Sequence, residues 1–276
     1  MNINIKGSLF DLSFPRVMGV LNITPDSFYK GSRVNSEKEI LSRAAKMLES
    51  GADMLDVGGY SSRPGAENIT EKKELERISH ALKLLRREFP SAILSLDTFR
   101  SSIAEIGINH FGVDIINDIS GGNLDDKIFD VIEKYKVPYI LMHMKGSPQN
   151  MHINPVYDDL MGELLKWFSV KKQELVLRGI KDIIIDPGFG FGKTIDHNFI
   201  LLNGLERFSI LGLPVLAGLS RKSMIWKTLE ISPDESLNGT VVLNTLALLK
   251  GVSILRVHDV AEAVQAIKLV SRLNAG

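Results

Sequence analysis

Eight short apolar runs, separated by stretches with helical spacing of apolar residues, constrain the fold of this 276-residue chain. Short buried strands that alternate with helices are typical of parallel sheets joined by crossover helices. Eight such units in a chain of about 250 residues are typical of a single closed (β/α)8 TIM barrel. The runs cover residues 17–22, 54–59, 93–97, 114–117, 139–143, 183–186, 215–220 and 254–258.

Most of these runs end in a polar or reactive residue. Packing of a barrel core does not by itself require polar side chains at that end of every strand. Because the active site of a (β/α)8 barrel lies at the carboxyl ends of its strands, the pattern indicates an enzyme. The polar ends are Asn22, Asp97, Asn117, His143, Asp186, Ser220 and His258.

We expect residues 1–276 to form one domain, since no linker, low-complexity tract or internal repeat divides the chain. Residues 1–14 are predicted to form a β-hairpin that closes the bottom of the barrel, because apolar residues flank Lys6 and Gly7. The first barrel helix is expected to begin at Ser36, with Glu39 completing a capping box.

Composition excludes several functional classes. Lys plus Arg and Asp plus Glu both number 33, so a global attraction to nucleic acid or to an acidic membrane is not expected. The absence of cysteine excludes disulfides, thiol nucleophiles and Cys-ligated zinc. Residues 1–6 lack the features of a signal peptide, and no apolar run is long enough to span a bilayer, so we expect a cytoplasmic protein.

Asp186 ends a run of three isoleucines and precedes Pro187, so its carboxylate is expected to be buried. Such a carboxylate suits a ligand with two parallel N–H donors, as in a guanidine, although an ion pair with a neighbouring lysine is an alternative. The glycines at 188, 190 and 192 do not have the spacing of either nucleotide-binding glycine motif. We expect them to let the backbone approach a ligand closely.

Arg256 and His258 are two residues apart in the last run, so both side chains are expected on the same side of the strand. With Asn22 in the adjacent first strand they predict an anion site, together with a magnesium ion that Asn22 could ligate. The alternative for Arg256 is that it neutralises a buried aspartate.

Asp97 and Asn117 end neighbouring strands and could read the edge of a heterocycle, whereas an Asx turn is the alternative for Asn117. Lys222 could donate to a carbonyl or ring nitrogen. Ser220 and Arg221 could meet a second substrate that carries a carboxylate, unless this segment is only a solvated helix start. His143, between two methionines, could be a core histidine.

In seven segments the chain resembles the dihydropteroate synthases, pterin-binding enzymes of folate biosynthesis. The first contains Asn22 in Asn-Ile-Thr-Pro-Asp-Ser-Phe, and the fifth is Asp-Pro-Gly-Phe-Gly-Phe-Gly-Lys from Asp186. Each segment alone is a weak signal, but all seven follow in the family's order over essentially the whole chain. They are residues 22–28, 61–66, 96–98, 117–121, 186–193, 220–222 and 256–258.

The resemblance implies condensation of 6-hydroxymethyl-7,8-dihydropterin pyrophosphate with 4-aminobenzoate, assisted by Mg²⁺, in a homodimer that sulfonamides inhibit. It implies pterin contacts from Asp97, Asn117, Asp186, Lys222 and Arg256. It implies pyrophosphate contacts from Asn22, Arg63, Arg256 and His258, with Asn22 on the metal. It implies aminobenzoate contacts from Ser62, Arg63, Ser220 and Arg221. The residues expected to carry catalysis are Asp97, Lys222, Arg256 and His258.

Two positions depart from the family pattern. Tyr60 stands where many relatives have an acidic residue, which leaves its role open, and Ser62 replaces threonine but retains the hydroxyl. Three alternatives share the barrel: a methyltetrahydrofolate-binding methyltransferase, a pterin-binding paralogue without catalysis, and a phosphosugar enzyme. An intact Arg256 and His258 pair argues against the paralogue, and segment 220–222 argues against the methyltransferase.

Overall fold

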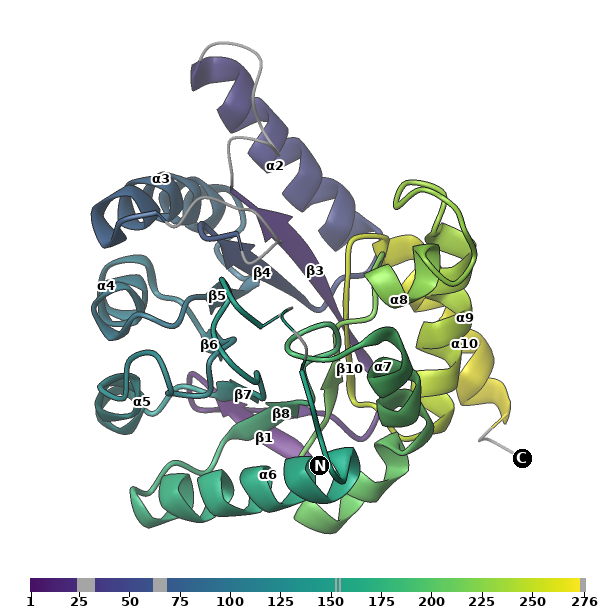
Figure 1. Cartoon of the computed structure of the whole chain (residues 1–276). Helices are drawn as coiled ribbons and strands as arrows, with labels where there is room; N and C mark the ends of the chain where they lie inside the picture. The colour runs from purple at the N-terminus through teal and green to yellow at the C-terminus, as the bar shows by residue number, and fades with distance from the viewer. Residues whose placement is uncertain (24–32, 62–68, 152, 154, 274–276) are drawn as a thin grey trace.

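The computed structural model describes residues 1–23, 33–61, 69–151, 153 and 155–273, and for residues 33–36 it describes the backbone alone. Within these ranges strands alternate with helices along the chain, and the helices surround the strands (Figure 1). None of the helices in the described ranges combines the length and the apolar character needed to cross a membrane.

The barrel strands are all parallel and follow the spatial order β8-β7-β6-β5-β4-β3-β10-β9. A parallel bridge between Ile185 and Val215 joins β8 to the residue before β9, so the sheet closes and the predicted barrel is confirmed. Only β9 is much shorter than its predicted run. The strands are β3 (Arg16–Asn22), β4 (Met54–Gly58), β5 (Ile93–Asp97), β6 (Ile115–Asp118), β7 (Tyr139–Met142), β8 (Ile183–Asp186), β9 (Leu216–Ala217) and β10 (Ile254–Val257).

The helical layer buries the outward faces of the strands in one large apolar core. Its elements are α2 (Arg33–Glu49), α3 (Glu71–Glu88), α4 (Ser101–Phe111), α5 (Ile128–Tyr135), α6 (Leu160–Leu177), α7 (Ile195–Asn203), the 3-10 helix η1 (Leu205–Leu211), α8 (Ser223–Trp226), α9 (Leu237–Leu249) and α10 (Val260–Leu273).

Local capping explains where some helices begin. The Thr70 side chain accepts a hydrogen bond from the backbone N–H of Lys73 at the start of α3, and Thr194 forms a capping box with His197 at the start of α7. The predicted start of the first helix at Ser36 is wrong, because α2 already begins at Arg33. A capping signal within a helix-forming stretch does not prevent the helix from extending further upstream.

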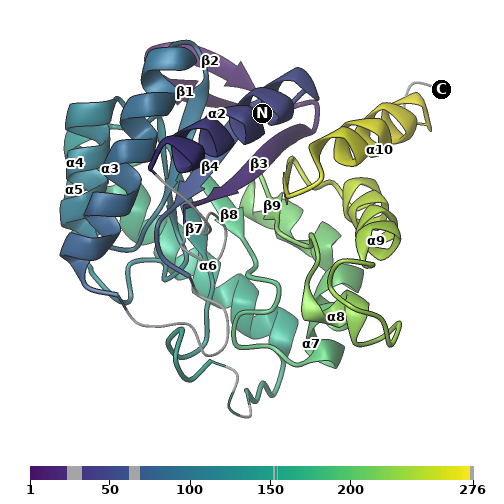
Figure 2. The same cartoon turned by 90° about the horizontal axis from the view of Figure 1, so that it is seen from above.

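The predicted N-terminal hairpin is confirmed. Strands β1 (Asn2–Ile5) and β2 (Ser8–Asp11) are antiparallel, and the turn residues Lys6 and Gly7 have φ of 50° and 82°. The hairpin lies at one end of the barrel (Figure 2), where its apolar residues pack into the bottom of the barrel core. The barrel residues in that cluster are Met18, Met54, Ile115, Ile140, Ile184, Leu216 and Ile254.

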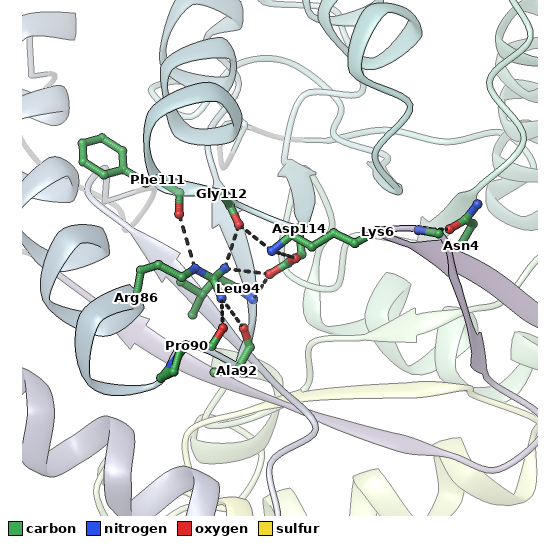
Figure 3. Close-up of polar contacts among 10 residues, drawn as sticks. Asn4, Lys6, Arg86, Pro90, Ala92, Leu94, Phe111, Gly112 and Asp114 are labelled. Carbon is green, nitrogen blue, oxygen red and sulfur yellow. Dashed lines mark hydrogen bonds and ion pairs between the residues drawn. The ribbon is translucent and has the colours of Figure 1, made fainter.

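A buried carboxylate fastens this hairpin to the barrel (Figure 3). Asp114 is 3 % exposed, and its oxygens lie 2.5 Å from the Lys6 Nζ in the hairpin turn and 2.9 Å from an Arg86 nitrogen on α3. Arg86 also donates to the backbone carbonyls of Ala92 and Gly112. Because every charge here has a partner, we interpret this cluster as a structural anchor.

Candidate active site

The carboxyl ends of the strands bring most of the predicted site residues to one end of the barrel. Asp97 and Asp186 end β5 and β8, Asn117 is the residue before the last of β6, and Arg256 lies within β10. Parallel strands place these ends at the same edge of the sheet, so residues far apart in the sequence converge there. Arg256 and Asp97, 159 positions apart, are in direct contact.

Arg256 is held between two carboxylates. Its Nε donates to Asp56 Oδ2 at 2.7 Å, and a terminal nitrogen donates to Asp97 Oδ2 at 2.8 Å. Burial by itself would lower the pKa of Arg256, but Asp56 and Asp97 raise the pKa above its usual value. The alternative in which Arg256 neutralises a buried aspartate is therefore observed. These hydrogen bonds lie in the guanidinium plane, so its flat face can still stack on a ring.

Asp56 is a member of this cluster that the sequence analysis missed. It lies in the middle of β4, is fully buried, and accepts from Ser95 Oγ at 2.6 Å, from Asn117 Nδ2 at 3.0 Å and from Arg256. A charged residue inside an apolar strand run was the available signal, because such a residue needs partners across the barrel interior.

Asn117 presents an unpaired acceptor inside the barrel. Its Nδ2 donates to Asp56, which fixes the orientation of the amide, since an ionised carboxylate only accepts. Its Oδ1 is buried and has no hydrogen-bond partner among the described residues. A buried unpaired oxygen is costly, so this geometry favours a ligand that donates to it. The Asx turn that was the alternative for Asn117-Asp118 is observed at Asp118, which accepts from Ser120.

Asp186 is 6 % exposed and accepts a hydrogen bond of 2.8 Å from the backbone N–H of Gly188. No ion pair joins it to any residue in the described ranges, so the predicted alternative of a lysine ion pair is not observed. Burial raises the pKa of Asp186, and the charges of Lys222, Arg256 and Lys193 only partly oppose this shift. The carboxylate is thus desolvated and able to accept more hydrogen bonds.

Lys222 reaches toward the same space. Its Nζ lies 4.4 Å from the centre of the Phe191 ring, a cation–π contact. Burial and the nearby charge of Arg256 together lower the pKa of Lys222 to about 8, although the charges of Asp186 and Asp97 oppose this shift.

Ser220 and His258 contact each other at the ends of β9 and β10. Their Oγ and Nδ1 atoms lie 3.0 Å apart, and the His258 backbone N–H donates to the same Oγ at 3.2 Å. Arg221 is not brought to this cluster. Its guanidinium pairs with Asp259 through two hydrogen bonds of 2.9 Å and donates to the carbonyls of Pro233 and Asp234. Its predicted contact with aminobenzoate finds no support in this geometry.

Asn22 lies at the end of β3, paired in register with Gly58 of β4. A Cβ built on Gly58 would lie 3.7 Å from Asn22 Oδ1 and 3.3 Å from Asp97 Cβ, so these two side chains flank bare backbone. No group of three His, Cys, Asp or Glu residues within the described ranges could hold a metal. The Asn22 side-chain oxygen is of the hard type that Mg²⁺ prefers, and an ion there would need phosphate oxygens and water as its other ligands.

His143 is a core histidine, as the sequence analysis predicted. It is 7 % exposed and packs edge-to-face on Trp167, and burial lowers its pKa to about 3. Its Nδ1 faces Lys193, a second buried residue that the sequence analysis missed. Ser62 and Arg63, predicted to contact substrates, lie outside the described residues.

Tyr60 joins three loops at this end of the barrel. Its ring meets the Phe99 ring edge-to-face at 5.3 Å, the Arg100 guanidinium lies 5.6 Å from its centre, and its hydroxyl accepts from Gln149 at 3.1 Å. Arg100 in turn pairs with buried Glu74. An acidic residue at position 60 would replace these ring contacts by charge.

Comparisons with known proteins identify what this arrangement resembles. The model of the family described as "Pterin binding enzyme" matches residues 18–258. A dihydropteroate synthase of Escherichia coli (strain K12) is 38 % identical over 272 residues, covering 98 % of this chain and 95 % of the relative. A dihydropteroate synthase of Synechocystis is 41 % identical over 260 residues, covering 93 % of this chain and 89 % of the relative.

Similar solved structures belong to the same family as these sequence relatives. A Yersinia pestis dihydropteroate synthase in complex with a sulfonamide drug has a TM-score of 0.92 and 38 % identity, with both chains covered fully. A Xanthomonas albilineans dihydropteroate synthase in complex with 7,8-dihydropteroate has a TM-score of 0.89 and 33 % identity, again with full coverage of both chains. The same enzyme with 4-aminobenzoic acid has a TM-score of 0.91 and 35 % identity, covering 100 % of this chain and 98 % of the other.

Proposed function

We propose roles for the strand-end residues from the premise that this chain belongs to the dihydropteroate synthases, a family of pterin-binding enzymes. It is a transferase of folate biosynthesis that condenses 6-hydroxymethyl-7,8-dihydropterin pyrophosphate with 4-aminobenzoate to 7,8-dihydropteroate and pyrophosphate. The observation that carries the residue roles is a desolvated carboxylate, Asp186, at the same end of the barrel as a buried amide, Asn117, whose oxygen has no hydrogen-bond partner among the described residues.

The pterin binds inside the barrel mouth. Its guanidine-like edge offers parallel N–H donors, which match the Asp186 carboxylate, and Asn117 Oδ1 accepts a further N–H. Lys222 donates from Nζ to the pterin carbonyl or a ring nitrogen. Asp97 completes the set of acceptors beside Arg256. Every one of these groups is buried or partly buried, so its hydrogen bonds to the pterin face little competition from water.

The pyrophosphate lies toward β3 and β10, with His258, Asn22 and Arg63 around it. Arg256 stacks on the pterin and adds positive charge near the leaving group. In the reaction the bond between the exocyclic carbon and the pyrophosphate oxygen breaks, and its electron pair leaves with pyrophosphate. The aminobenzoate nitrogen then forms the new C–N bond and loses a proton. Family precedent favours departure before attack, so positioning and charge complementarity are the main contributions of the protein.

Aminobenzoate binds at the outer side of this site, with Ser220, Ser62 and Arg63 near its carboxylate. Arg221 pairs with Asp259 and so stabilises the segment that carries Ser220, rather than touching the substrate. Sulfonamides are proposed to compete for the same place, as the complex of the Yersinia pestis relative suggests.

Asn22 would hold a Mg²⁺ ion, which would supply positive charge to the pyrophosphate leaving group. Replacing Asn22 by Ala is expected to raise the Mg²⁺ concentration needed for half-maximal pyrophosphate binding by about tenfold, since one metal ligand is lost. Calorimetry of pyrophosphate binding at graded Mg²⁺ measures this. An unchanged Mg²⁺ dependence would contradict the metal role, and the affinity for a pterin without pyrophosphate serves as the control.

The pH dependence of pterin binding tests Asp97. Burial raises the pKa of Asp97 to about 7, although the Arg256 guanidinium opposes this shift. Since only ionised Asp97 can accept two pterin N–H groups, pterin affinity is expected to fall as the pH drops below about 7, approaching tenfold per unit. Calorimetry across this range measures the slope. An Asp97→Asn variant should bind weakly with a flatter profile, and a flat profile for the unchanged protein would refute the role.

We also propose that the enzyme acts in the cytoplasm as a homodimer, with small-molecule substrates as its other partners. Large apolar side chains on α9 and α10 support an interface there, because they are exposed in one chain. Light scattering at micromolar concentration is expected to give twice the chain mass, and a monomer would contradict this proposal. The exposed residues are Val242, Leu246, Leu249, Leu269 and Leu273.

A further inference from the structure

Lys193 is a buried lysine to which the proposed reaction gives no role, and burial lowers its pKa to about 7. It follows the glycine-containing loop of residues 188–192 and is only 7 % exposed. Its side chain folds back onto that loop, and its Nζ donates to the backbone carbonyls of Gly188 and Phe191, both at 3.0 Å. One ammonium group thus holds both halves of the loop.

The same ammonium also contacts the neighbouring strand end. Lys193 Nζ lies 3.3 Å from His143 Nδ1 and 3.5 Å from the His143 carbonyl oxygen. Burial keeps the pKa of His143 at about 3, so the imidazole is neutral and its Nδ1 can accept. The His143 backbone N–H donates to the Asp186 carbonyl at 3.0 Å. Lys193 therefore connects the loop after β8 to the end of β7.

The loop depends on this attachment because its backbone has an uncommon conformation. Gly188, Gly190 and Gly192 have φ of +73°, +80° and +63°. A Cβ at Gly188 would lie 2.0 Å from the His143 carbonyl oxygen, so the loop is pressed against β7 with no room for a side chain. Glycine-rich backbone loses more entropy on ordering than any other, and the ammonium group offsets part of this cost.

The loop in turn touches two residues proposed to bind the pterin. The Gly188 N–H donates to the Asp186 carboxylate at 2.8 Å. The Lys222 Nζ lies 4.4 Å from the centre of the Phe191 ring, and a Cβ built on Gly190 would lie 3.4 Å from Lys222 Cδ. A shift of the loop would therefore move the partners of both side chains.

We propose that Lys193 is a positioning residue: its ammonium group fixes the loop of residues 188–192, and through Gly188 and Phe191 it holds Asp186 and Lys222 in place for the pterin. The inference rests on the proposed pterin contacts of Asp186 and Lys222. Lys193 does not touch the substrate itself, since its Nζ is surrounded by the backbone carbonyls and by His143.

A double-mutant cycle tests this inference, with affinity for 6-hydroxymethyl-7,8-dihydropterin pyrophosphate measured by calorimetry. Lys193→Met should weaken pterin binding by about tenfold, and Lys222→Met should weaken it at least as much. In the double variant the combined loss should be smaller than the product of the two single losses, because part of the effect of Lys193 acts through Lys222. Binding stoichiometry separates the affinity of folded protein from a loss of folded protein.

Lys172→Met is the matched control, because Lys172 also donates from Nζ to a backbone carbonyl, that of Leu211, but on the outer helical layer. It should leave pterin affinity unchanged. Lys193→Gln keeps two N–H donors, so it should recover part of the pterin affinity. It replaces Lys193→Met in the double-mutant cycle if Lys193→Met fails to fold. Multiplying losses, or an unchanged affinity in Lys193→Met, would overturn the inference alone. If the protein without substitutions does not bind the pterin, both the inference and the proposed function are overturned.

Discussion

Replacing Asp186 by Asn is expected to weaken binding of the pterin substrate by about 3 kcal/mol, roughly a hundredfold or more. The carboxylate is proposed to accept two N–H groups, and an asparagine would turn one acceptor into a donor that faces another donor. Calorimetry with the pterin pyrophosphate measures this loss. Asp130→Asn is the matched control, since Asp130 is an exposed carboxylate on α5 that pairs with Arg178, and its pterin affinity should be unchanged.

The Asp186→Asn variant should not lose stability. Burial raises the pKa of Asp186 in the folded protein, so folding favours its protonated form. The contribution of this group to the free energy of unfolding therefore falls as the pH rises from the ordinary carboxyl pKa through the raised one. Asp186→Asn should be at least as stable as the unchanged protein at pH above neutrality. A variant that binds pterin normally but unfolds more easily would show that Asp186 is structural and would contradict the account.

Replacing Arg256 by Met is expected to have the largest effect on stability, lowering the free energy of unfolding by about 3–5 kcal/mol. The reason is that Asp56 is fully buried and the Asp97 side chain is only 19 % exposed, and both would lose their cationic partner. Turnover should be lost as well, since this guanidinium is proposed to contact the pterin and the leaving group. Urea unfolding at neutral pH measures the change in stability.

A second substitution separates charge imbalance from lost packing. Asp56→Asn, added to Arg256→Met, removes one of the two uncompensated carboxylates and should recover a large part of the lost stability without restoring turnover. Arg178→Met is the control, because Arg178 forms its ion pairs on the surface, and it should cost less than about 1 kcal/mol. If the double variant is no more stable than Arg256→Met, the loss comes from packing and the proposed charge balance is wrong.

The barrel could be predicted from the sequence because strand and helix periodicities differ and because most strand ends carry a polar residue. The positions of Asp97, Asn117, Asp186 and Arg256 at one end of the sheet follow from the parallel topology alone. The N-terminal hairpin was also predictable, since a Lys-Gly turn between apolar alternations has few other solutions. Helix boundaries were less certain, as the early start of α2 shows.

What could not be predicted depends on contacts between distant segments. Asp56 was overlooked because its three partners lie on three other strands, and nothing local marks it apart from its charge. The sequence also does not reveal that Arg221 pairs with Asp259, 38 residues later. Lys193 was overlooked because its partners are mostly backbone carbonyls, which leave no signature in residue types.

Release of pyrophosphate accompanies every turnover of a dihydropteroate synthase, so its measurement is the decisive experiment for this barrel. The purified protein is mixed with the pterin pyrophosphate, 4-aminobenzoate and Mg²⁺, and each component is omitted in turn. We predict multiple-turnover release that requires all three components and is lost in Arg256→Met. Tight binding of the pterin pyrophosphate without release under the complete conditions would contradict the account and identify a pterin-binding protein without synthase activity.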